Sequence, residues 1–261
     1  MTKPGSATDK LVPQSATRAV LAKRAAALVG LALLLVPLPG CQSISGSPSL
    51  AEISIIDASP DAPVVDIYQG ANVLAQQVGF QAVSSYIQVA PGTYGFLVDV
   101  EKTTQQLISA QGTIQAGNKY TILIGNYLNS LQEVILKDQS TAAPAGQMNV
   151  RFLDQSLHGG AFDIYLVPSG STVVQVKPVL TNVTFNTNTG YFTIPSGTYS
   201  LVVEPTGTVP TVTGTPTYSG ASFNYASGAA RTFIIMDQTV VTTPPIFVYI
   251  RADYDSPSAT S

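Results

Sequence analysis

The chain has 261 residues, with 12 Lys and Arg against 15 Asp and Glu, and its formal net charge is −3. Five of the basic residues lie within the first 24 residues, and no basic run follows them. Phosphate neutralisation needs clustered Lys and Arg, so this composition excludes typical nucleic-acid-binding proteins. The single cysteine, Cys41, excludes an intramolecular disulfide, so stability must come from buried apolar surface.

The first 40 residues have the features of a secretory signal peptide. A basic stretch precedes an apolar run from Ala25 to Leu38, which is shorter than the roughly 20 residues that a membrane-spanning helix needs. The run ends in Leu38-Pro39-Gly40-Cys41, which resembles the lipobox of bacterial lipoproteins. An uncleaved anchor, or ordinary cleavage with Cys41 incidental, are the alternatives.

The lipobox resemblance implies that residues 1–40 are removed and that Cys41 carries a lipid anchor containing palmitate or a similar acyl chain. Residues 41–50 would then form a flexible tether to the membrane. Gln42 follows the cysteine, and by the same resemblance this favours an outer membrane where two membranes exist. Removal of residues 1–40 takes away five basic residues and one acidic residue, which leaves a net charge near −7.

Short β-branched and aromatic runs, bounded by Gly, Pro or Asn, predict β-strands after residue 50. Clear examples are residues 52–56, 94–100, 120–124 and 199–203. Side chains alternate along a strand, so Tyr120, Ile122 and Ile124 should share one face. No long segment with helical periodicity follows Cys41, and we therefore expect an all-β fold.

The chain repeats itself once. Residues 57–68 resemble residues 154–165 at an offset of 97, and the motif at 91–94 recurs at 196–199, at an offset of 105. The motif at 117–121 recurs at 228–232, at an offset of 111. The growing offset predicts insertions in the second copy, at roughly 168–189 and 205–227. A period this long indicates tandem domains, since solenoid repeats are much shorter.

Each copy carries enough short strands for a small β-sandwich. We expect a first sandwich at 51–138, a linker at 139–147, a second sandwich with loop insertions at 148–254 and a tail at 255–261.

Three motifs of the first copy, at residues 57–68, 91–94 and 116–121, resemble the domain-of-unknown-function family 4397. The resemblance covers nearly all of residues 51–138 and is weaker over 148–253. It implies two tandem immunoglobulin-like antiparallel β-sandwiches of an exported bacterial protein. It implies no reaction and no cofactor.

Asp57, Asp61 and Asp66 are weak candidates for calcium ligands, because calcium prefers hard oxygen ligands. Their spacing matches no EF-hand loop, and the second copy lacks a counterpart of Asp61. We therefore expect no metal and no cofactor. Asp57 and Ser59 should instead hydrogen-bond turn amides, and Asp66 should point outward from a strand.

His158 is the only histidine, and it lies in a predicted turn where a solvated side chain is expected. With no second histidine and no free cysteine, the chain offers a poor catalytic set. Nucleophile-elbow, phosphate-loop and zinc-ligand spacings are also missing from the sequence.

The second insertion carries the best candidates for ligand contact, namely Tyr218, Phe223, Asn224 and Tyr225. Exposed aromatic rings and amides on loops can bind sugars or protein partners. The alternative is a loose hairpin whose aromatic rings fold back on the sheet.

We expect a lipid-tethered, non-enzymatic module of the cell envelope that binds an envelope protein or a polysaccharide. The alternative is a hydrolase of an envelope or extracellular polymer that uses a carboxylate pair such as Asp57 and Asp66. A third possibility is a purely structural spacer.

Overall fold

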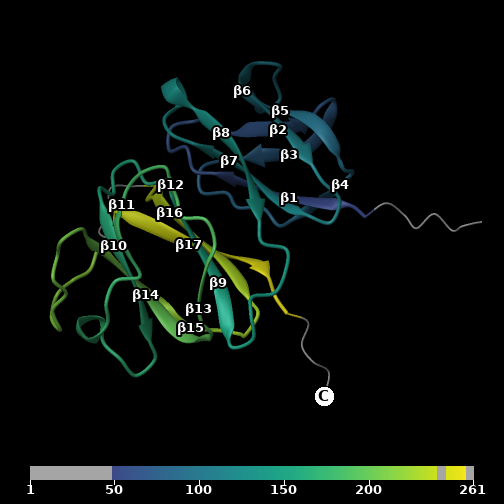
Figure 1. Cartoon of the computed structure of the whole chain (residues 1–261). Helices are drawn as coiled ribbons and strands as arrows, with labels where there is room; N and C mark the ends of the chain where they lie inside the picture. Colours follow the sequence, from purple (N-terminus) through teal and green to yellow (C-terminus); the bar gives the residue numbers. More distant parts are fainter. Residues whose placement is uncertain (1–48, 240–244, 257–261) are drawn as a thin grey trace, which may run out of the picture. The chain divides into compact units, whose positions relative to one another are not determined.

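The computed structural model describes residues 49–239 and 245–256. The signal segment 1–40, Cys41 and most of the expected tether lie outside these residues. Residues Ser45–Ser261 form one compact unit, which contains both copies of the repeat (Figure 1). Within the described residues, no helix is long and apolar enough to cross a membrane.

The first copy folds into two four-stranded sheets (Figure 1). One sheet has the order β4-β1-β7-β8, and the other has the order β3-β2-β5-β6. Their elements are β1 (Ala51–Asp57), β2 (Val65–Gln69), β3 (Asn72–Val78), β4 (Ile87–Val89), β5 (Gly92–Val100), β6 (Gln106–Ile114), β7 (Lys119–Gly125), the 3-10 helix η1 (Leu128–Ser130) and β8 (Gln132–Asp138).

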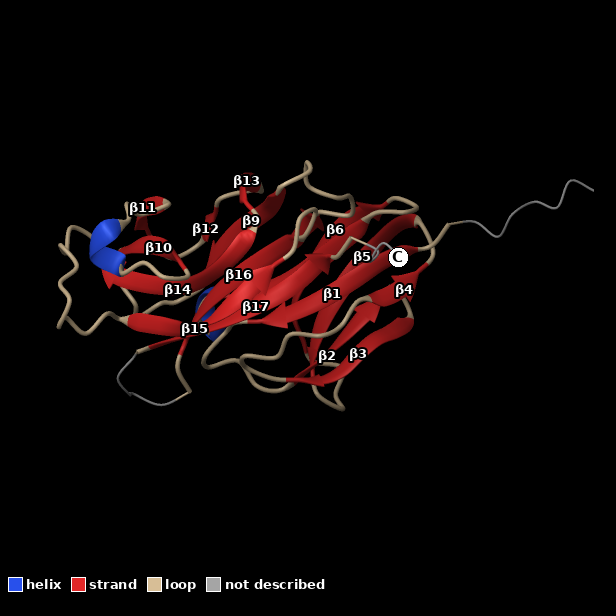
Figure 2. Ribbon diagram, turned by 90° about the horizontal axis from the view of Figure 1, so that it is seen from below, coloured by secondary structure: helices blue, strands red, loops and turns tan. Residues whose placement is uncertain are grey.

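The second copy repeats this plan with sheets β12-β9-β16-β17 and β11-β10-β14-β15, and β13 also pairs with β9 (Figure 2). Its elements are β9 (Gln147–Asp154), β10 (Phe162–Pro168), the 3-10 helix η2 (Val173–Gln175), β11 (Leu180–Val183), β12 (Thr187–Asn188), β13 (Phe192–Pro195), β14 (Gly197–Pro205), β15 (Tyr218–Tyr225), β16 (Ala230–Asp237) and β17 (Ile246–Tyr254). The predicted all-β fold is confirmed.

The strand register is the same in the two copies. Glu52 pairs with Lys119 in the parallel β1–β7 ladder, and Asn149 pairs with Ala230 in the parallel β9–β16 ladder. These equivalent pairs are separated by the offsets of 97 and 111 found in the sequence. All other ladders of both copies are antiparallel, so one parallel pair is a repeated feature of each sandwich.

Each sandwich has its own apolar core between its two sheets. Tyr120, Ile122 and Ile124 all face the first core, as the alternation predicts. In the second core, the ring of Phe152 stacks on that of Phe233 with centroids 4.7 Å apart.

A third apolar cluster lies between the two sandwiches, and we call this contact the seam. Its buried members are Ile56, Ala58, Leu123, Leu153, Ile234 and Met236. The strands β1, β7, β9 and β16 therefore bury both faces, one in a core and one in the seam. This explains why runs such as 53–56 and 233–236 are apolar almost without alternation.

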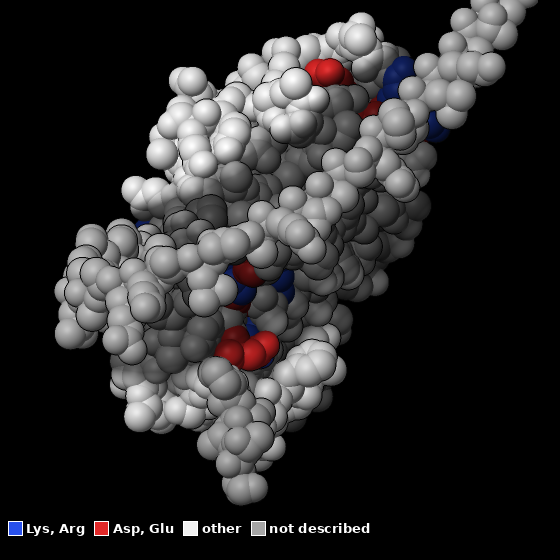
Figure 3. Space-filling view, turned by 90° about the vertical axis from the view of Figure 1, so that its right-hand side faces the viewer, with Lys and Arg blue, Asp and Glu red and all other residues white. Residues whose placement is uncertain are grey.

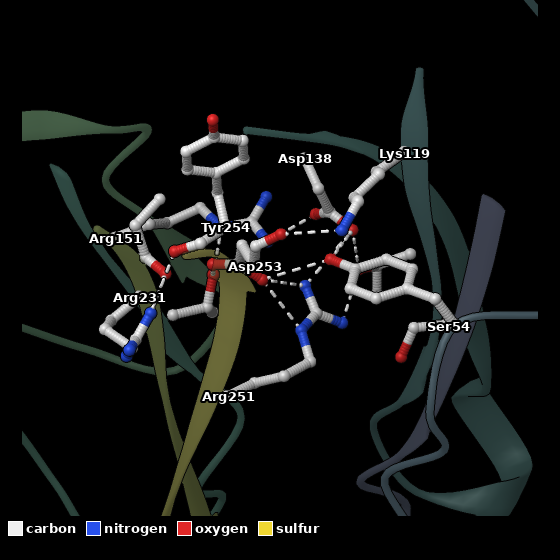
Figure 4. A network of polar contacts seen from close by, with 12 residues as sticks. Ser54, Lys119, Asp138, Arg151, Arg231, Arg251, Asp253 and Tyr254 are labelled. Carbon is white, nitrogen blue, oxygen red and sulfur yellow. Dashed lines mark hydrogen bonds and ion pairs between the residues drawn. The ribbon is translucent and has the colours of Figure 1, made fainter. Parts of the chain in front are cut away.

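A network of charges continues the seam beyond the apolar cluster (Figure 4). Asp138, at the end of β8, lies 2.5 Å from Nη2 of Arg151 and 3.1 Å from Nη2 of Arg251. Arg251 also lies 2.7 Å from Asp253 and donates to Thr121 Oγ1 at 2.8 Å. The side chains of Asp138 and Asp253 are fully buried, so each charge has exchanged water for protein partners.

Aromatic rings complete the network. The hydroxyl of Tyr86 donates toward Asp138 and Asp253, and the guanidinium groups of Arg251 and Arg151 lie over the rings of Tyr86 and Tyr191. Burial, and then the charge of Asp138, raise the pKa of Tyr86 far above its ordinary value. Its hydroxyl therefore remains a donor. In Figure 3, acidic and basic side chains lie side by side in a recess near the centre of the face, and a few others lie along its upper edge.

We expect Asp138→Ala to lower the free energy of unfolding by about 3–5 kcal/mol, because it leaves two buried guanidinium groups without their shared partner. The two sandwiches should also unfold in separate transitions. Urea denaturation followed by circular dichroism measures both effects.

Glu101→Ala is the matched control, because it breaks the pair with Lys102, whose side chain is 75% exposed. This change should cost less than about 1 kcal/mol. An Asp138→Ala protein as stable as the Glu101→Ala protein would contradict the assigned role of the seam.

Candidate functional site

The aspartate that opens the repeated motif shapes a turn in both copies. Asp57 Oδ1 accepts the amide of Ser59 at 3.0 Å, and Asp154 Oδ1 accepts the amide of Ser156 at 2.9 Å. The expected turn bond to Asp57 is confirmed, whereas the Ser59 hydroxyl is buried without a partner in the structure. Burial raises the pKa of Asp57 to about 7 and that of Asp154 to about 6.

Asp66 also has a structural role. It lies on the face of β2 opposite the core, as expected, but loops bury it. Its two oxygens accept the amides of Gln77 and Lys102, each at 3.0 Å. Both of those residues have a positive φ, so the carboxylate stabilises two strained positions, one where the register of β3 shifts and one in the turn after β5. Asp163 repeats this arrangement in the second copy with the amides of Asn182 and Gly207.

The three candidate calcium ligands have separate partners, because Asp61 accepts the amide of Leu128 at 2.7 Å. Among the described residues, no three His, Cys, Asp or Glu side chains are grouped to hold a metal ion. Asp57 is fully buried, and both oxygens of Asp66 accept backbone amides. The structure therefore contradicts this pair as the acid and base of a hydrolase.

His158 is 63% exposed, but it has partners that the sequence did not predict. Its Nδ1 lies 3.3 Å from Asp237, and its Nε2 lies 3.0 Å from the hydroxyl of Tyr127 in the first sandwich. Asp237 also accepts the backbone amides of Leu157 and His158. His158 is therefore an exposed residue of a bend, as the sequence predicts, and it is also a contact across the seam.

The predicted ligand-binding residues lie on a strand. Residues 218–225 form β15, whereas the sequence analysis placed them on an insertion loop, and that placement is wrong. The true insertion is the 206–217 connection, which corresponds to the shorter 101–105 connection of the first copy. Tyr218 packs against the core of the second sandwich.

Phe223, Asn224 and Tyr225 line a hollow of about 230 Å³ together with Arg231 of β16 and Ile250 of β17. We call this the edge hollow. Phe223 is 51% exposed, and Tyr225 is buried with its ring 6.1 Å from that of Phe233. Burial raises the pKa of Tyr225 to about 12, so its hydroxyl stays protonated.

Ile135 of β8 occupies the equivalent place in the first copy. The residue of the first copy at the Phe223 position is Gly112, since Gly112 pairs with Tyr94 as Phe223 pairs with Tyr199. Ile135 fills the space beside Gly112, where an added Cβ would collide with it. In the second sandwich, Phe223 stands at the position of Gly112, and a hollow remains between β15 and β17.

Arg231 is the second difference between the copies. It stands where the first copy has the core residue Tyr120, 111 positions earlier. Its Nη1 donates to the carbonyls of Ala230 and Tyr254, and its Nη2 lies 2.5 Å from Asp255. The hollow therefore combines aromatic rings and a fixed guanidinium group, which together can bind a polar ligand with apolar faces. The amide side chain of Asn224 lies on the other face of β15, where its Oδ1 accepts the hydroxyl of Thr198 at 3.5 Å.

The two insertions meet on the outer face of the sheet that contains β10 and β14. Val173 and Val176 of the 169–179 connection pack on Tyr165, Val167 and Val202. Beside them lies a second hollow of about 240 Å³, the insertion hollow, with aliphatic and hydroxyl-bearing walls. Its lining includes Val167, Val173, Val202, Thr211, Val212 and Ser219.

Residues 51–165 match the model of a family described as a domain of unknown function, DUF4397. The predicted DUF4397-like domain is thus confirmed. No curated protein matches the chain.

Three solved structures of carbohydrate-binding proteins are similar to the chain at low identity. "Alpha-glucan binding by a streptococcal virulence factor" has 9% identity and a TM-score of 0.24, and covers 70% of this chain and 92% of that chain. The family 41 carbohydrate-binding modules from streptococcal virulence factors have 10% identity, a TM-score of 0.26 and coverages of 76% and 96%. A family CBM26 module from Eubacterium rectale Amy13K, in complex with maltoheptaose, has 14% identity, a TM-score of 0.24 and coverages of 79% and 98%. With such low TM-scores, the ligands of these proteins carry no argument about this chain.

The buried aspartates predict an unusual dependence of stability on pH. The folded-state pKa values of Asp57 and Asp154 lie above the ordinary 3.8, so the folded protein binds protons that the unfolded chain does not. The free energy of unfolding should therefore rise by on the order of 2 kcal/mol as the pH falls from 8 to 5.

Glu133, whose pKa burial also raises to about 7, contributes with the same sign. Urea titrations at several pH values measure the effect, and Asp57→Asn should reduce it. A stability that falls steadily from pH 8 to pH 5 would contradict this assignment.

Proposed function

We propose that this chain, which carries a DUF4397 domain, is a non-enzymatic binding module of the cell envelope that holds a polysaccharide in the edge hollow. The proposal rests mainly on the half-exposed ring of Phe223. The equivalent residue of the first copy is Gly112, and Ile135 fills the space beside it. Single exposed apolar side chains are common, but this ring lines a hollow together with Tyr225 and the guanidinium group of Arg231. An apolar surface bordered by polar groups is typical of a ligand site.

The chemistry of the hollow suits a sugar ring. An aromatic face packs against the apolar C–H face of a sugar, while a guanidinium group hydrogen-bonds its hydroxyls. The sheet that carries β15 is also the one that the seam leaves uncovered in the second sandwich. A long polymer could therefore reach the hollow without separating the two sandwiches.

We expect Phe223→Ala to weaken polysaccharide binding at least tenfold, equivalent to about 1.4 kcal/mol, because it removes the apolar platform. Affinity electrophoresis or calorimetry with purified envelope polysaccharides measures the loss.

Tyr249→Ala is the control, since it removes another exposed aromatic ring that does not line the edge hollow. Val212→Ser tests the rival surface, the insertion hollow. Loss of binding in Val212→Ser but not in Phe223→Ala would refute the edge hollow as the site.

The second part of the proposal is the membrane tether, in which lipid on Cys41 anchors the exported chain to the envelope, to an outer membrane where one exists. One acyl chain binds a membrane only marginally, whereas the several chains of bacterial lipoproteins give a firm anchor.

Detergent phase partitioning and intact mass test this tether. The wild-type protein should lose residues 1–40, gain a lipid-sized mass and enter the detergent phase, and Cys41→Ala should abolish the last two effects. A wild-type protein that stays in the aqueous phase without added mass would disprove the anchor.

A further inference from the structure

Arg231 places a positive charge beside the edge hollow, where the first copy has an uncharged core residue. A buried or half-buried charge is unfavourable unless it is paired, and this one is paired twice. Two backbone carbonyls, of Ala230 and Tyr254, hold Nη1 at 2.9 and 3.0 Å, and the carboxylate of Asp255 holds Nη2. The carbonyl contacts fix the guanidinium group whether or not Asp255 is present.

Asp255 is the weaker of these partners. Its side chain is 61% exposed, and it follows the last residue of β17 rather than belonging to a strand. Exposed ion pairs contribute little, because water and salt compete with them and the side chain loses entropy on pairing. A carboxylate from elsewhere can therefore replace that of Asp255 at small cost.

The guanidinium group also has unused capacity. Arginine carries five N–H donors in a planar fork, and the carbonyl contacts here use those on Nη1. Asp255 engages Nη2 through one oxygen. A ligand carboxylate on the Nε–Nη2 edge could form two parallel hydrogen bonds, which is the stronger and more specific arrangement.

We infer that Arg231, which lines the edge hollow, pairs with a ligand carboxylate in place of Asp255, and that the polysaccharide bound there contains uronic acid residues. Asp255 itself lines a different hollow, together with Glu52 and Asp253. The carboxylate of one uronate pairs with Arg231, and the face of its sugar ring lies on Phe223. This inference rests on the proposed function and specifies its ligand class. The net charge of the mature chain, near −7, disfavours non-specific adsorption of a polyanion. Binding of a polyuronate therefore depends on the local positive charge of Arg231.

The test compares binding of polyuronates (alginate, polygalacturonate and hyaluronate) with binding of neutral polymers (dextran, xylan and amylose) to the full mature chain. The wild-type protein should bind at least one polyuronate tenfold or more tighter than every neutral polymer. Asp255→Asn should tighten polyuronate binding about threefold or more, because it removes the competing carboxylate, and should leave neutral polymers unaffected.

Arg231→Lys should weaken polyuronate binding about tenfold, because lysine lacks the planar fork. Thermal unfolding checks that this variant is folded. If it is not, the Asp255→Asn variant, whose changed side chain is exposed, still tests the inference.

If neutral polymers bind as tightly as polyuronates, and if this binding depends on Phe223, the inference is overturned and the proposed function is retained. Binding of neither class would overturn both, and unchanged polyuronate binding in Asp255→Asn would overturn the inference alone.

Discussion

Asp138 joins the two halves of this protein. Its buried carboxylate lies in the first sandwich and pairs with Arg151 and Arg251 of the second. Such a cluster is stable only when every charge keeps its partner, because one unpaired buried charge costs several kcal/mol. The apolar seam beside it brings the two copies together, and the ion pairs specify how they align. The raised pKa values of Asp57 and Asp154 arise at the ends of strands that bury one face in this seam.

Docking of the sandwiches also determines which surfaces remain available. The sheet with β9 and β16 faces the first sandwich, so the other sheet of the second copy, β11-β10-β14-β15, faces away from the seam (Figure 2). The 169–179 connection covers part of its outer face. Both hollows border that sheet. The two copies have thus diverged in function while keeping the same register. The first has a closed edge at Gly112 and Ile135, and the second has an open one at Phe223.

The fold was largely predictable, because each strand and the repeat leave local signals in the sequence. The offsets of 97, 105 and 111 recur in the strand register, which pairs chemically similar residues in both copies. The seam was not predictable in the same way. Its charges, such as Asp138 and Arg251, lie more than 100 positions apart and look like ordinary surface residues. The nearly continuous apolar runs at 53–56 and 233–236 were the available sign of burial on both faces.

The candidate site was only partly predictable. Composition singled out Phe223, Asn224 and Tyr225 but placed them on a loop, because the Thr, Gly and Pro-rich stretch before them merges into β15 without a clear boundary. Arg231 and Ile250 were missed, since they come from other strands and join the site only through sheet pairing. A position-by-position comparison of the copies would have found Arg231, which replaces Tyr120, and would have supported Phe223, which replaces Gly112.

An experimental structure of the mature chain with a bound oligosaccharide tests the central claim most directly. We expect a sugar ring on the face of Phe223, with its polar groups within hydrogen-bonding distance of Arg231. The two sandwiches should remain docked through Asp138. An oligosaccharide bound on another surface, with the edge hollow empty, would contradict the account.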